Sequence, residues 1–146
     1  MLEHDMLRQV LYTKAITVVN TNNFLCKIGE EPFVPPTDGT LYGEFWFRTA
    51  DAEQLELGSM TGQECSPGIA QFTIFAPEKD GDGPSLKLAG ALKHYLNRQQ
   101  WIVPPDGYVN LQSASVKQLG IKNGKKVVVV DCHFDFYYNN PAAAPT

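Results

Sequence analysis

Apolar and polar residues alternate along several stretches of the chain, and this alternation predicts β-strands. The clearest stretch is 41–48 (LYGEFWFR). In an extended backbone, successive side chains point to opposite faces, so aromatic residues would lie on both faces of this strand. One face would carry Leu41, Gly43, Phe45 and Phe47, and the other Tyr42, Glu44, Trp46 and Arg48.

Two further segments alternate in the same way. In 68–76, one face would carry Ala70, Phe72, Ile74 and Ala76. In 126–138, Val128, Val130, Cys132, Phe134 and Phe136 would face one way, and Val127, Val129, Asp131, His133 and Asp135 the other. A register slip of one residue in 126–138 would bury two aspartates, so the pattern specifies the register well.

The segment 108–120 alternates more weakly, and we interpret it as a strand. Between it and 126–138 stands Asn123-Gly124, the strongest short-range signal for a β-hairpin. The sequence therefore predicts a C-terminal β-hairpin.

Helical periodicity occurs in two places. In 84–98, Pro84 suits the first helical position and Asp82 precedes it, where an acid is favoured. The apolar stripe of this helix comprises Leu88, Ala89, Leu92, Tyr95 and Leu96. A shorter helix is expected over 2–15, with Leu7, Val10, Leu11 and Lys14 on one face.

The remaining segments are expected to be short strands, loops or tails. The β-branched run 15–19 (AITVV) predicts a short strand, and 20–23 a turn. Three prolines and an Asp-Gly pair exclude regular structure over 30–40. Segment 49–67 is expected to be a long, mobile connection with a short strand at EQLEL, 101–107 a rigid loop, and 139–146 a flexible tail.

These elements predict an α+β fold with an antiparallel or mixed β-sheet and one main helix packed on it. The apolar face of 126–138 would pack against the stripe of 84–98. Residues 1–138 are expected to form a single domain, because 146 residues are too few for two ordinary domains.

Composition narrows the class of protein. A net charge of −4 argues against a nucleic-acid-binding protein, and no apolar run approaches the roughly 18 residues of a membrane span. The N-terminus lacks the features of a secretory signal. Cys26, Cys65 and Cys132 are widely separated and odd in number, which argues against a disulfide framework or a zinc site and suits a reducing cytoplasm.

The glycine-rich segment 77–84 (PEKDGDGP) has to be considered as a phosphate-binding loop. Such loops donate backbone N–H groups, whereas Pro84 has none and Asp82 would repel a phosphate. The spaced acids and terminal Glu of a calcium-binding loop are also missing. We therefore interpret the segment as a corner between a strand and a helix.

Asp131, His133 and Asp135 form the most interesting polar pattern, because all three would project from one face of a strand. A histidine between two carboxylates can bind a metal or titrate near neutral pH. Consecutive same-face residues are about 7 Å apart, too far for all three to share one ion without distortion. The alternative is a row facing solvent or another subunit. The serines and histidines fit no catalytic motif, so we assign no catalytic, cofactor-binding or metal-binding residue and expect no enzyme activity.

Segment 32–101 resembles the tail terminator, or tail-completion, proteins of long-tailed phages and prophages. The matching features are Pro32-Phe33, the Pro-Pro-x-Asp-Gly run ending at Gly39, Tyr42, Gly68 to Ile74, Pro77, Gly83 and Leu88-Ala89. One departure is Glu31, because relatives often carry Asn before the Pro-Phe pair.

The resemblance implies a structural virion protein that forms a homohexameric ring and needs no cofactor. Such a ring caps the head-proximal end of the tail tube and joins it to the head connector, or stopper, protein. Genomic DNA would pass through the lumen without specific binding, and the protein would be made in the bacterial cytoplasm. The alternatives are another head–tail adaptor, a tail-tube-like subunit, or a small metal-dependent enzyme using Asp131, His133 and Asp135.

Overall fold

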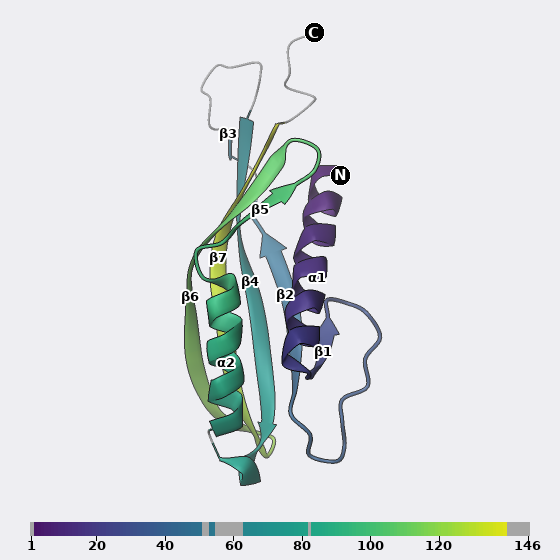
Figure 1. Cartoon of the computed structure of the whole chain (residues 1–146), viewed down its shortest axis with the longest axis vertical. Helices are drawn as coiled ribbons and strands as arrows, with labels where there is room; N and C mark the ends of the chain where they lie inside the picture. The colour runs from purple at the N-terminus through teal and green to yellow at the C-terminus, as the bar shows by residue number, and fades with distance from the viewer. Residues whose placement is uncertain (1, 51–52, 55–62, 82, 140–146) are drawn as a thin grey trace.

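The computed structural model describes residues 2–50, 53–54, 63–81 and 83–139. These residues form two α-helices, one 3₁₀ turn and seven strands (Figure 1). In chain order they are α1 Leu2–Asn22, β1 Leu25–Ile28, β2 Tyr42–Thr49, β3 Glu53–Gln54, β4 Gln63–Pro77, η1 Glu78–Asp80, α2 Gly83–Leu96, β5 Gln100–Val103, β6 Gly107–Lys122 and β7 Lys125–Asn139.

All seven described strands belong to one sheet. Its order is β1-β2-β4-β7-β6-β5, and β3 pairs with β4 beside this path. β1 and β2 run parallel, while the other paired strands run antiparallel. The α+β class and the mixed sheet predicted from the sequence are confirmed.

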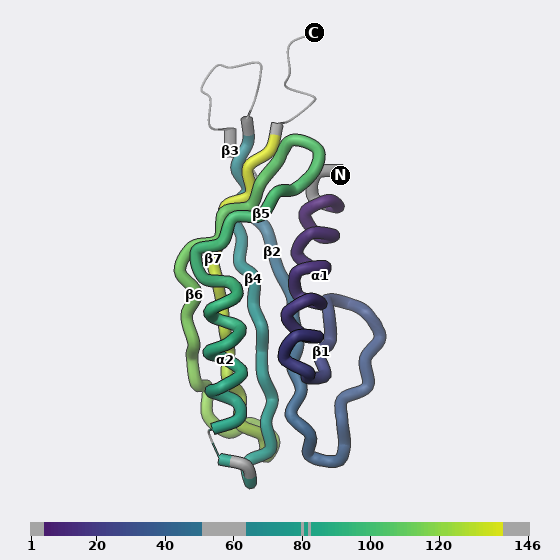
Figure 2. Tube along the Cα trace, viewed as in Figure 1, coloured from purple at the N-terminus to yellow at the C-terminus, as the bar shows by residue number. Residues whose placement is uncertain are grey.

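Both helices pack on the same face of the sheet. The tube in Figure 2 shows α1 and α2 side by side, running in opposite directions in front of the strands. One buried cluster joins Leu7 and Leu11 of α1, Leu92 of α2, Phe72 of β4 and Phe134 of β7. Neither helix in the described part of the chain is long and apolar enough to cross a membrane.

The prediction of one main helix and a short N-terminal helix is wrong. α1 has 21 residues, against 14 in α2, and it includes the AITVV run predicted to be a strand. Leu7, Leu11, Ala15 and Val18 follow one another at helical spacing and are all buried. Their burial against the core outweighs the β-propensity of the branched residues.

The helix continues through its polar residues because their side chains bond within it. The hydroxyl groups of Thr17 and Thr21 donate to the carbonyls of Thr13 and Thr17, each at 2.9 Å. Asn23 then adopts φ 52°, a left-handed conformation that ends helices. The predicted turn at 20–23 is therefore mostly the last turn of α1.

Two short strands were missed. β1 adds a parallel edge strand beside β2, with Ile28 buried opposite Phe45. β5 occupies residues predicted to form a rigid loop, and it pairs with the start of β6. Trp101 and Val103 face the core from β5, which only the packed structure makes evident.

β6 and β7 pair antiparallel on both sides of a two-residue turn. Asn123 and Gly124 have φ values of 54° and 75°, the positive values that this kind of hairpin turn requires. The even-numbered residues of β7 from Val128 to Tyr138 lie in the core, so the register predicted for 126–138 is confirmed. Most of the predicted tail 139–146 and of the predicted connection 49–67 lies outside the described residues, at 140–146, 51–52 and 55–62. Within the described residues both predictions are wrong, because β7 extends to Asn139 and β4 begins at Gln63.

Candidate functional site

The sheet face opposite the helices is the first candidate for a functional surface, and we call it the open face. Strand pairing places on it the residues that alternate with the core positions. They are Tyr42, Glu44, Trp46 and Arg48 of β2; Ile69, Gln71, Thr73 and Phe75 of β4; Tyr108, Asn110, Ser115 and Lys117 of β6; and Val127, Val129, Asp131, His133, Asp135 and Tyr137 of β7.

The predicted polar row lies on the open face, but its three members differ. Asp131 is buried, accepts a 2.6 Å hydrogen bond from the Ser115 hydroxyl and lies 3.2 Å from Lys117 Nζ. Asp135 accepts a 3.0 Å hydrogen bond from Gln112, and His133 is exposed.

The two carboxylates of this row are thus held by neighbouring strand residues. Among the described residues, no three His, Cys, Asp or Glu side chains lie close enough together to hold a metal ion. The geometry fits a sheet surface with paired charges better than a metal centre.

Aromatic rings cluster near both ends of the open face. Near one end, the Tyr42 ring stacks on Phe75 with centroids 4.9 Å apart and lies 5.9 Å from Phe33 of loop 29–41. The ammonium of Lys125 lies 4.7 Å from the Tyr42 centroid. Near the other end, Tyr108 stacks on Tyr137 at 4.9 Å. Tyr42 is buried, with Phe33 against it, whereas Phe75, Tyr108 and Tyr137 are partly exposed.

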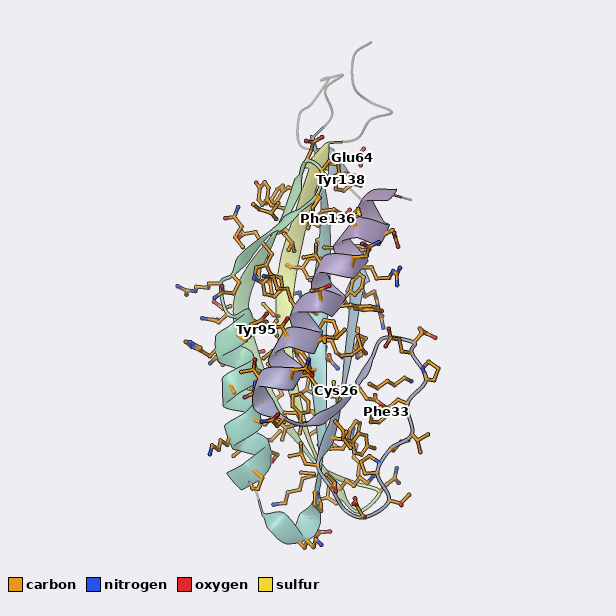
Figure 3. The ribbon with its side chains drawn as sticks, turned by 45° about the vertical axis from the view of Figure 1, so that its right-hand side comes forward. Cys26, Phe33, Glu64, Tyr95, Phe136 and Tyr138 are labelled. Carbon is orange, nitrogen blue, oxygen red and sulfur yellow. The ribbon has the colours of Figure 1, made fainter. Side chains whose placement is uncertain are left out.

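Different side-chain contacts stabilise the two ends of the molecule. Figure 3 shows Phe33 on the loop beside β1, far from Tyr138 and Glu64 at the other end. Tyr138 donates a 2.8 Å hydrogen bond to Glu64 Oε2 and stacks on Phe136. This bond joins the end of β7 to the start of β4.

The glycine-rich segment is a corner, as its sequence indicated. β4 ends at Pro77, η1 follows, Gly81 has φ 70°, and α2 begins at Gly83. A Cβ atom placed on Gly81 or Gly83 would meet nothing within 4 Å, so neither glycine serves a close backbone approach within the chain. Asp82 lies outside the described residues.

Two of the three thiols, those of Cys26 and Cys132, are poorly suited to nucleophilic chemistry. Burial raises the pKa of Cys26 to about 12 and that of Cys132 to about 11, so both remain protonated near neutral pH. Cys132 is fully buried, as expected for a small apolar residue. Cys65 is also buried, with its sulfur 3.8 Å from Asp135 Oδ1.

Two hollows flank loop 29–41. One, of about 780 Å³, lies between the end of α1, β1 and the start of α2, and its lining includes Val19, Phe24, Leu41 and Leu88. The other, of about 610 Å³, lies between the prolines of the loop and the β6–β7 turn. The lining residues of both hollows include no Asp, Glu, His or Cys, so neither hollow offers a pair of side chains for acid–base catalysis.

The comparisons with known proteins inform the fold. No protein-family model matches the sequence, and no curated protein matches it. Among the solved structures that the chain matches, one superposes with a TM-score of 0.74 at 14% sequence identity, covering 96% of this chain and 99% of the other. The name of that protein states no function, so the likeness establishes a shared fold alone.

Proposed function

We propose that this chain is a structural subunit of a phage virion, a tail terminator. Its copies form a ring on the head-proximal end of the tail tube and join it to the head connector. The motifs from Pro32 to Trp101 that resemble this family support the position in the particle, and the exposed aromatic rings of the open face support assembly.

The observation that carries the proposal is the one-sided covering of the sheet. α1 and α2 pack on the same face, while Trp46, Phe75, Tyr108 and Tyr137 remain partly exposed on the open face. An antiparallel sheet often leaves one face to solvent, but that face is then mostly polar, so aromatic rings exposed there favour a covering partner. In a ring, further copies or other tail proteins would cover the second face.

Charge is compatible with a DNA channel. The net charge is −4, and the acidic chain would not hold a genome that has to pass through the ring. A strongly basic lumen would bind phosphates and slow this passage.

The test is localisation in virions. A short epitope added after Thr146 and detected with gold-labelled antibody is expected to mark one band at the neck of each particle. Label along the whole tail would instead indicate a tube-like subunit, and label on the head side of the neck another adaptor. Absence of label from particles that carry the tagged gene would overturn the virion proposal.

The enzyme alternative predicts a bound metal at Asp131, His133 and Asp135. Elemental analysis of the purified protein tests it directly. Stoichiometric metal that is lost in a His133→Ala variant would favour the enzyme, whereas a metal-free protein that still joins particles supports the structural role.

A further inference from the structure

A ring of identical subunits needs two different surfaces on each copy, one for each neighbour. Resting on the proposed function, we propose that these surfaces are the two lateral edges of the sheet. The outer edge of β6 in one copy contacts loop 29–41 and β1 of the next copy, through opposite charges and exposed aliphatic side chains.

The first surface is the exposed half of β6, which we call the basic edge and define as residues 115–122. β5 covers the start of β6, pairing with residues 107–110. The Leu111 N–H then donates to the Gln99 carbonyl, and the Arg98 N–H donates to the Gln112 carbonyl. Beyond this point, no strand in the described part of the chain pairs with the outer side of β6.

The basic edge combines apolar exposure with positive charge. Leu119 and Ile121 are 45% and 53% exposed, and the exposed residues Lys117 and Lys122 lie beside them. A hollow of about 220 Å³ lies here, with Ser85, Gln118 and Ile121 in its lining.

The second surface is the acidic edge, which we define as β1 together with loop 29–41. Leu25 and Val34 are 51% and 86% exposed, and Glu30 and Glu31 are exposed between them. Each edge therefore carries two exposed aliphatic side chains. β1 also carries Lys27, which lies opposite Glu44 of β2, so the acidic charge of this edge comes from loop 29–41.

The charges of the two edges differ. Loop 29–41 contains three acids, Glu30, Glu31 and Asp38, and no Lys or Arg, whereas the basic edge contains Lys117 and Lys122 and no acid. Not all of these charges are available to a neighbour, because Lys117 pairs with Asp131.

The positions of the two edges favour a ring. In Figure 1, β6 and loop 29–41 lie on opposite sides of the molecule and overlap in height along its long axis. A rotation about an axis parallel to the long one would bring the basic edge of one copy against the acidic edge of the next, without a step along the axis. Such a contact closes on itself instead of growing into a helix.

The contact is made by side chains and not by adding strands to the sheet. The β6–β7 ladder is irregular between Leu111 and Ala114 and again between Gln118 and Gly120. Bulges and lysines on an edge strand oppose pairing with another strand. The exposed Val34 side chain is the natural occupant of the hollow beside Ile121.

Charge reversal tests this arrangement. The basic-edge variant carries I121E and K122E, and the acidic-edge variant carries E30K and E31K. Each variant alone places like charges at every contact, so we expect its assembly to fall roughly tenfold or more. Mixed together they can alternate, which restores opposite charges at every contact, and assembly is expected to recover.

The matched control is I16E/K93E, which makes the same changes on exposed helix positions of α1 and α2. It should assemble like the wild type. All variants are first compared by circular dichroism and thermal unfolding, so that loss of assembly is separated from loss of fold.

Assembly is measured in two ways, as epitope label at the neck of particles and as mass in sedimentation velocity of the purified chain. Wild-type label at the neck with undiminished label for both edge variants would overturn the edge contact and leave the proposed function standing. If the wild type is absent from particles but forms rings in solution that the edge variants do not form, the proposed function is overturned and the edge contact stands. A wild-type chain that stays monomeric in solution and absent from particles would overturn both.

Discussion

At the scale of single residues, Gly68 shows how closely the strands approach. It lies on β4 opposite Thr49 of β2 and Phe134 of β7. A Cβ atom at this position would collide with the Arg48 carbonyl oxygen and the Phe134 ring. The sequence shows only a glycine at the start of a strand, and the reason for it lies in two strands distant in the chain.

We therefore expect Gly68→Ala to lower the free energy of unfolding by about 1–3 kcal/mol, because the added methyl forces these neighbours apart. The control is Gly90→Ala in α2, where a Cβ would meet nothing within 4 Å. That change should raise stability by about 0.5–1 kcal/mol, since alanine favours the helix. Urea unfolding measures both, and equal effects would contradict this account of Gly68.

The buried thiols give the protein a predicted pH dependence. Burial raises the pKa of Cys132 from 9.0 to about 11, and that of Cys26 from 9.0 to about 12. Because the folded state binds the thiol protons more tightly than the unfolded state, stability is fully present below pH 9 and falls as the pH rises toward 11 and 12.

For Cys132 this loss should reach about 2 kcal/mol near pH 11. Urea unfolding at pH 8, 10 and 11 measures it, with Cys26→Ala/Cys132→Ala as the comparison. The double variant should lose less stability over this range. It should keep a smaller decline, since burial also raises the pKa of Tyr95 and of Tyr137. Identical slopes for the two proteins would rule out the thiols as the cause.

At the scale of elements, α1 illustrates a conflict between local propensity and packing. Thr17, Val18 and Val19 favour a strand locally, yet Val18 completes a buried stripe that begins at Leu7. Thr17 is exposed on the opposite side of the helix, with its hydroxyl bonded to the Thr13 carbonyl.

The helical conformation at Thr17 is tested by substitution at this exposed position. Thr17→Ala should stabilise the protein by about 0.5 kcal/mol, because alanine is the better helix former. Thr17→Gly should be about 1 kcal/mol less stable than the alanine variant. If residues 15–19 formed a strand, Thr17→Ala would instead be destabilising, and chemical denaturation separates these outcomes.

At the scale of the whole molecule, the sheet is covered on one face and carries opposite charges at its two edges. The open face and the edges together leave aromatic and aliphatic surface that a monomer does not bury. This arrangement makes self-association sensitive to electrostatic screening, because the proposed contact pairs surface charges.

Raising NaCl from about 50 mM to about 1 M shortens the Debye length from roughly 14 Å to roughly 3 Å and should lower the assembled fraction at fixed protein concentration. Sedimentation velocity across this series measures the change. The edge-reversed variants should respond in the opposite direction, since salt screens their repulsion. Assembly that strengthens with salt in the wild type would indicate a contact made mainly by apolar surface.

The sequence by itself determined the elements whose patterns are local. The alternation in 126–138 fixed which side chains enter the core, because a slip would turn Asp131 and Asp135 into the apolar core under the helices. Asn123-Gly124 fixed the turn, because few residues adopt two successive positive φ values. Pro84 and the stripe from Leu88 to Leu96 fixed α2.

Tertiary structure alone decided the features that depend on distant partners. α1 extends through 15–19 because Ala15 and Val18 find a core to bury against, and β1 and β5 exist because β2 and β6 offer them an edge. The partners of the Asp131 carboxylate come from β6, which strand pairing brings beside β7. The separation of acidic and basic edges likewise arises from strand order, since β1 with loop 29–41 and the exposed half of β6 lie at opposite edges only after the sheet has formed.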